Sequence, residues 1–168
     1  MAYRDHFKLV DDMIDHLNNV IGGIKDPFIT SRYVGFVAVA AVTVYELAVK
    51  EIFYEFARKK HKTFGNFVDK HFDRINGRIK LSIIREDYLP HFGDKYSQRF
   101  EAKIRKWEER SIKERKGSIT TAYGNIITWR NEFAHEGKIP STPTYTEVTK
   151  AYYTGKSIID CLAETMQR

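Results

Sequence analysis

The chain has 168 residues, with only four prolines and ten glycines, and its formal net charge is +6. This length is enough for a single domain, residues 1–168, with a sizeable core, and the low proline and glycine content argues against an all-β or loop-rich chain. The positive charge favours polyanionic partners such as nucleic acid.

The first predicted helix covers Tyr3 to Ile21, where apolar residues recur at three- and four-residue steps. Gly22-Gly23 ends it. Thr30 or Ser31 can then cap a second helix that runs to about Lys60. This second helix is the longest element that the sequence predicts.

The stretch from Tyr33 to Val49 within the second helix is nearly all apolar, which indicates a central helix buried nearly all round. Glu46 interrupts this stretch, and the charged region that follows it argues against a membrane span. A carboxylate in an apolar helix needs a partner. One interpretation pairs Glu46 with an arginine or tyrosine across the core, and a second places it at a functional site.

Two short helices are predicted in the middle of the chain, over Thr63 to Ile75 and Arg78 to Leu89, with Asn76-Gly77 as the turn between them. Three histidines fall in or beside this region without a thiolate or a closely spaced second histidine. The sequence therefore predicts no metal site and no cofactor.

A basic helix is predicted from about Lys95 to Lys116, with Asp94 as its cap. The segment carries nine Lys or Arg against four Glu, so nine minus four, or five, of the six net positive charges lie here. One interpretation is a solvated face whose charges compensate each other. The other is a surface that tracks RNA phosphates, for which the candidate residues are Lys103, Arg105 and Arg110.

The following helix starts after Gly117-Ser118 and ends in Arg130-Asn131-Glu132-Phe133-Ala134-His135, with Gly137 as a plausible stop. At about 100° per residue, Asn131 and His135 share a face of the helix, whereas Arg130 lies about 140° from His135. A histidine at a helix C-terminus is favoured as imidazolium, which suits proton transfer near neutral pH. A closing helix is predicted over Glu147 to Met166, with Cys161 in the core.

These residues resemble the signature of the HEPN superfamily, in which an arginine and a polar residue such as asparagine precede a histidine by a short spacer. The continuation Ala134-His135-Glu136-Gly137 is similar to the RiboL-PSP branch. The resemblance implies an all-α bundle of about five to seven helices, with the motif at the C-terminal end of the penultimate helix. It also suggests Glu46 as the acidic residue that HEPN domains often carry on an earlier helix.

The function that this resemblance implies is metal-independent endoribonuclease activity, in which the 2′-OH attacks the phosphate and leaves a 2′,3′-cyclic phosphate and a 5′-OH. Arg130, Asn131 and His135 are the expected catalytic residues, Glu46 is a possible supporting residue, and Lys138 joins the candidate RNA-binding residues. Such domains are often toxins or phage-defence effectors that act on tRNA or other cellular RNA. They commonly form homodimers, so a homodimer is expected here.

A rival interpretation is a non-catalytic basic helical module that binds nucleic acid or a partner protein. An antitoxin or another regulatory partner is possible in either case. The single Cys161 excludes an internal disulfide framework, and no secretion leader opens the chain, so a cytoplasmic location is expected.

Overall fold

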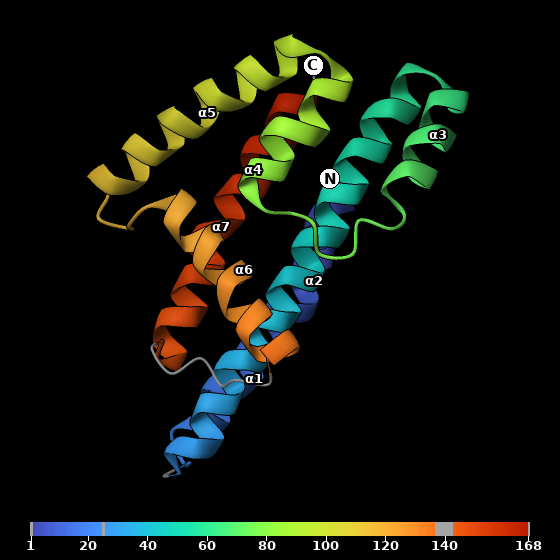
Figure 1. Ribbon diagram of the computed structural model, residues 1–168. Helices are drawn as coiled ribbons and strands as arrows, with labels where there is room; N and C mark the ends of the chain where they lie inside the picture. Colours follow the sequence, from blue (N-terminus) through green and yellow to red (C-terminus); the bar gives the residue numbers. More distant parts are fainter. Residues whose placement is uncertain (1, 25, 137–142, 168) are drawn as a thin grey trace.

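The computed structural model describes residues 2–24, 26–136 and 143–167, without the side chains of residues 135 and 136. Within these ranges the chain forms helices and no strand (Figure 1). The α-helices are α1 (Lys8–Ile21), α2 (Pro27–Lys60), α3 (Lys62–Phe72), α4 (Leu81–Ile83), α5 (Asp94–Lys113), α6 (Ile119–Glu136) and α7 (Tyr145–Met166). The short 3₁₀ helices are η1 (Ala2–Phe7) and η3 (Leu89–Phe92), and η2 (Ile84–Tyr88) is a π-helix. The predicted all-α bundle is confirmed, and the motif lies at the end of the penultimate helix.

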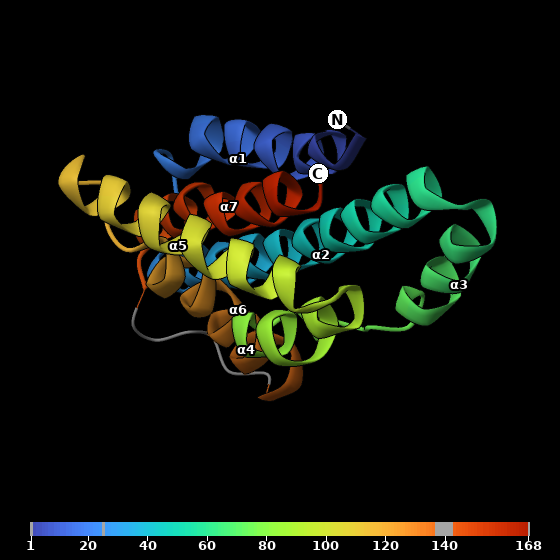
Figure 2. The same cartoon turned by 90° about the horizontal axis from the view of Figure 1, so that it is seen from above.

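Helix α2 organises the bundle, because α1, α3, α6 and α7 all pack against it. With 34 residues, it is about 50 Å long at a rise of 1.5 Å per residue. Helices α1, α2 and α7 run side by side, and α5 crosses α7, as both views show (Figures 1 and 2). None of the helices in the described ranges is long and apolar enough to cross a membrane.

The centre of the core is a stack of three tyrosines, one from each of α2, α6 and α7. The ring of Tyr45 lies between those of Tyr123 and Tyr152, at centroid distances of 5.3 and 5.8 Å. The Tyr45 hydroxyl donates to the backbone carbonyl of Tyr152. A buried phenol needs such an acceptor, so this contact fixes how α2 and α7 pack.

Helix α2 is less enclosed than its sequence suggested. Val37, Ala41 and Tyr45 are fully buried, but Phe36 is 53% and Leu47 39% exposed. One stripe of the helix therefore faces away from the core, and the prediction of burial nearly all round was wrong for that stripe.

Two predicted helix caps were also wrong. The N-cap of α2 is Asp26, whose carboxylate accepts from the Phe28 amide at 2.9 Å, and neither Thr30 nor Ser31 has this role. Pro27 explains the shift, since proline is well suited to the first position of a helix. Helix α5 begins at Asp94 itself, with Gly93 at the N-cap.

The second short helix of the middle region starts later than Arg78. Residues 73–80 form a loop between α3 and α4, and the helical run from Leu81 continues through η2 and η3 to Phe92. Asn76 and Gly77 both have positive φ, at 44° and 77°, which confirms the turn predicted there. This loop, called here the 73–80 loop, lies against the motif helix.

Candidate functional site

The end of α6 is held against α2 by an aromatic contact. The ring of Phe133 packs on Phe36 with centroids 5.7 Å apart, and it also covers Gly35. A Cβ built on Gly35 would lie 2.1 Å from the Phe133 ring, which is closer than real atoms approach. Only glycine therefore lets the motif helix lie this close to α2.

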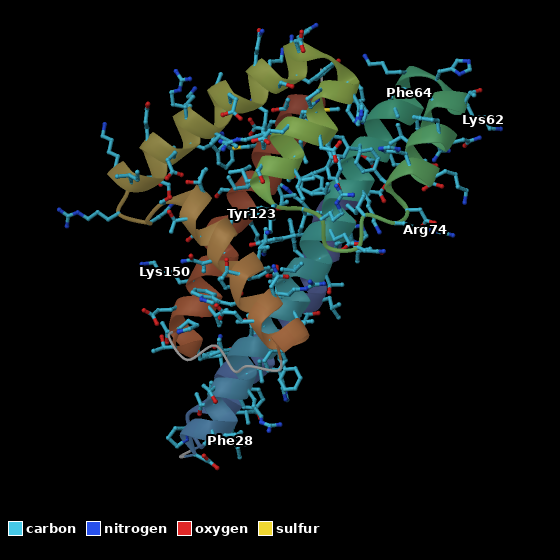
Figure 3. The ribbon with its side chains drawn as sticks, in the orientation of Figure 1. Phe28, Lys62, Phe64, Arg74, Tyr123 and Lys150 are labelled. Atoms are coloured by element: carbon cyan, nitrogen blue, oxygen red, sulfur yellow. The ribbon has the colours of Figure 1, made fainter. Side chains whose placement is uncertain are left out.

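Two tyrosine hydroxyls hydrogen-bond to backbone carbonyls of the 73–80 loop and hold it against the bundle. Tyr123 of α6 donates to the carbonyl of Ile79 at 2.7 Å, and Tyr88 donates to the carbonyl of Arg78 at 2.7 Å. Figure 3 shows Tyr123 at the inner side of α6, facing this loop. Burial raises the pKa of Tyr123 well above its ordinary value. Its phenol therefore stays protonated and remains a donor.

Helix α2 fastens the same loop from the other side. The Glu46 carboxylate accepts from the backbone amide of Gly77 and pairs with Lys50 at 2.8 Å. Lys50 also donates to the carbonyl of Asp73 at 3.0 Å. The partners of Glu46 are thus a backbone amide and a lysine, so the expected arginine or tyrosine across the core was wrong. The reason is that the 73–80 loop lies close enough to α2 for the Gly77 amide to donate to the Glu46 carboxylate.

Arg130 packs against this loop at Gly77. A Cβ on Gly77 would be 3.1 Å from the Nη2 atom of Arg130, so the guanidinium rests directly on the glycine backbone. Its Nη1 atom donates to the side-chain oxygen of Asn131 at 3.0 Å. Asn131 therefore orients the arginine.

Glu46, Gly77, Arg130 and Asn131 thus form one connected group, with Gly77 as the link between the carboxylate and the guanidinium. His135 belongs to the last turn of α6, where the helix register keeps it on the face of Asn131. Its side chain lies outside the described residues, as do Lys138 and the predicted stop Gly137.

The basic residues predicted on α5 are not brought to this group. Lys103 pairs with Glu164 at 2.7 Å and Arg110 pairs with Glu114 at 2.7 Å, while Arg105 is exposed. Helix α5 adjoins the start of α6, and Arg130 lies about 16 Å further along that helix at 1.5 Å per residue. The basic face of α5 therefore lies away from the motif. Two of its three candidate RNA-binding residues are paired with glutamates.

Nothing in the sequence linked Gly77 and the 73–80 loop to the motif helix. The Asn-Gly pair signalled a turn, but no local pattern shows which helix a turn will contact. Within the described residues no three His, Cys, Asp or Glu side chains gather as metal ligands would.

Replacement of Gly77 by alanine tests whether the loop positions Arg130. A Cβ there meets the guanidinium, and the backbone φ of +77° disfavours any other residue, so we expect a stability loss of about 1 kcal/mol. We also expect the ribonuclease activity predicted from the sequence, measured as an initial rate, to fall about tenfold as the arginine is displaced. The matched control is Gly93→Ala, because Gly93 has φ of +105° with nothing within 4 Å of its Cβ. Equal loss of cleavage in both variants would contradict a positioning role.

The family model described as RiboL-PSP-HEPN matches residues 3–168. No curated protein and no solved structure matches the chain.

Proposed function

Because the chain belongs to the RiboL-PSP-HEPN family, we propose that it is a metal-independent endoribonuclease whose catalytic residues are Arg130, Asn131 and His135. The observation that carries this proposal is the placement of Arg130. Its guanidinium is held between Asn131 and the Gly77 backbone at the end of the helix that also bears His135. Cleavage through the 2′-OH needs a cation for the phosphoryl oxygens and a group that transfers a proton, and an arginine and a histidine in the last turns of one helix can supply both.

The proposed reaction uses the nucleophile that RNA itself carries. The 2′-oxygen attacks the phosphorus, the bond to the 5′-oxygen breaks, and the products carry a 2′,3′-cyclic phosphate and a 5′-OH. Protons leave the 2′-oxygen and reach the 5′-oxygen, and His135 serves as the base or the acid for one of these transfers. Arg130 donates two hydrogen bonds to the phosphoryl oxygens, whose negative charge grows in the transition state.

Glu46 acts in this scheme through the 73–80 loop. It holds the Gly77 amide, and Gly77 in turn supports the guanidinium. Glu46 is therefore a positioning residue rather than a catalytic one. Toxin or phage-defence activity on tRNA or other cellular RNA, in the cytoplasm and under the control of an antitoxin, is the setting that this reaction fits.

Cleavage of total RNA and tRNA in EDTA tests the proposed activity. We expect the wild-type protein to cut without added metal and His135→Ala to be reduced at least about a hundredfold, since general acid–base catalysis contributes that much or more. Circular dichroism should show both proteins equally helical. Cutting that persists undiminished in His135→Ala would contradict the assignment of this residue.

A homodimer is the proposed assembly, and an exposed apolar stripe on α2 supports it. Phe28 and Phe36 are 56% and 53% exposed, and they lie on one side of the helix with Ile29 nearby. Figure 3 shows Phe28 at the end of α2 that extends beyond the bundle. The stripe continues into Phe133 of the motif helix. Exposed apolar surface of this kind marks a protein interface, and this one would bring two motifs together.

Phe36→Glu tests this interface. Burying a glutamate at a two-fold interface places two like charges close together, so we expect the dimer to dissociate, with Kd rising at least about a hundredfold. Light scattering after size-exclusion chromatography measures the change. Phe67→Glu is the matched control, because Phe67 is 65% exposed on α3, away from the motif. A dimer that survives Phe36→Glu, or a wild-type monomer at all concentrations, would contradict this interface.

A further inference from the structure

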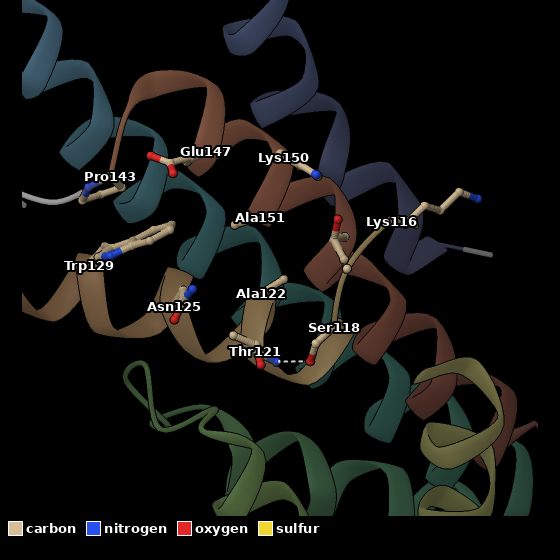
Figure 4. Close-up of a pocket in the computed structure, with 12 residues that line it drawn as sticks. Lys116, Ser118, Thr121, Ala122, Asn125, Trp129, Pro143, Glu147, Lys150 and Ala151 are labelled. Atoms are coloured by element: carbon tan, nitrogen blue, oxygen red, sulfur yellow. Dashed lines mark hydrogen bonds between the residues drawn. The ribbon is translucent and has the colours of Figure 1, made fainter. Parts of the chain in front are cut away.

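A groove of about 480 Å³ runs between α6 and α7, on another side of α6 from the Gly77 contact. Thr121, Asn125 and Trp129 line it from α6, where they are four residues apart and share one face. The α7 side is lined by Lys150 and by small residues such as Ala151. Figure 4 shows these side chains around the hollow, with Trp129 at one end and Ser118 towards the other. We call it the α6–α7 groove.

One end of this groove offers a flat aromatic surface. The indole of Trp129 is half-buried, packed against the core, and Pro143 lines the groove beside it (Figure 4). Nucleic-acid bases stack on such rings irrespective of sequence. The Asn125 amide stands one helical turn away and provides both a donor and an acceptor for a base edge.

The other end of the groove carries positive charge. Lys116 and Lys150 both line it. Lys116 pairs with Glu114 at 2.7 Å, whereas Lys150 makes no ion pair in the described part of the chain. Glu147 is turned to the start of α7, where its carboxylate accepts from the Thr144 amide at 2.7 Å. The first amides of α6 are already bonded to Glu108, at 2.9 Å for Ile119. A phosphate would therefore be recognised mainly by Lys150 and not by the helix terminus.

From this arrangement we infer that the α6–α7 groove binds one nucleotide of the RNA strand, with its base on Trp129 and its phosphate towards Lys150. The inference rests on the proposed ribonuclease function and adds a substrate subsite to it. Trp129 and Arg130 are consecutive, so their side chains leave the helix about 100° apart in the same turn. A strand that crosses the end of α6 can place one base at Trp129 and a neighbouring phosphate at Arg130.

Binding is measured without cleavage by using a 2′-O-methyl octanucleotide, which lacks the nucleophile. In a Trp107→Phe background Trp129 is the one tryptophan, and we expect saturable quenching of its fluorescence. Lys150→Glu should raise Kd, measured by anisotropy of the labelled octanucleotide, about tenfold or more. Lys62→Glu is the control of equal charge change, because Lys62 lies on α3, far from Lys150 (Figure 3). Trp129→Leu should weaken binding about tenfold, with unchanged helicity as the check on folding.

Three outcomes would overturn this subsite. They are no quenching by the octanucleotide, equal effects of Lys150→Glu and Lys62→Glu, or quenching by free AMP and UMP as strong as by the octanucleotide. The last result would assign the groove to a free nucleotide. Cleavage of RNA without quenching would refute the subsite and leave the catalytic proposal standing. Quenching without any cleavage would support the subsite and contradict the catalytic proposal.

Discussion

Arg130→Ala is expected to lower the rate of RNA cleavage about a hundred- to a thousandfold, while the protein stays folded. Removal of a single preorganised donor to a developing negative charge typically has this effect. Arg130 is half-buried and does not belong to the core, so its truncation leaves the packing of α6 on α2 intact. Initial rates on a defined tRNA, at substrate concentrations above and below KM, measure the change.

Arg130→Lys refines this test. Lysine keeps the charge but lacks the planar fork, and it cannot both donate to Asn131 and hold two phosphoryl oxygens as arginine does. We therefore expect most of the activity to be lost in Arg130→Lys as well. Arg58→Ala controls for loss of positive charge, because Arg58 is exposed in the last turn of α2, at the far end from the motif. Full activity in Arg130→Lys would show that charge alone matters and would contradict the proposed bidentate contact.

Gly35→Ala is expected to give the largest change in stability. Its Cβ would lie 2.1–2.4 Å from three carbons of the Phe133 ring, so either the ring or the end of α6 must move. Overpacking of this kind costs about 1–3 kcal/mol. For a chain of this size, that lowers Tm by roughly 2–12 °C. Because Phe133 belongs to the motif, we expect the rate of RNA cleavage to fall as well as the stability.

Two further variants isolate the Gly35 clash. Gly124→Ala, on the exposed side of α6 with nothing within 4 Å of its Cβ, should raise stability, by about 0.5–1 kcal/mol. Combining Gly35→Ala with Phe133→Ala removes the ring, so the two losses should not add. Additive losses in thermal melts would contradict direct contact between these positions.

The sequence predicted the parts of this fold that depend on local pattern. The helix end at Ile21, the long α2 and the position of the motif near the end of α6 all follow from helical spacing and glycine stops. The predicted start at Tyr3 was wrong, because residues 2–7 form the separate 3₁₀ helix η1 and α1 begins at Lys8. The caps of α2 and α5 were mistaken because several polar residues near each start were equally good candidates. At α2 the choice was decided by Pro27, which fits the first turn of a helix.

The site was predictable only in part. The motif makes Arg130, Asn131 and His135 the candidates, and a carboxylate in an apolar helix makes Glu46 one; their roles stay predictions. The contact of Gly77 with Arg130 joins residues far apart in the chain, and it depends on how the 73–80 loop is fastened by Tyr88 and Tyr123. Such a contact follows from tertiary packing, which no local spacing encodes.

The most direct measurement uses a DNA oligonucleotide that contains one ribonucleotide, incubated with the protein in EDTA. If the 2′-OH is the nucleophile and Arg130 and His135 act on its phosphate, cutting occurs only on the 3′ side of the ribonucleotide. Mass spectrometry then finds a 2′,3′-cyclic phosphate on one fragment and a 5′-OH on the other. Cutting of the all-DNA strand at the same rate, or products that carry a 5′-phosphate, would contradict the proposed reaction.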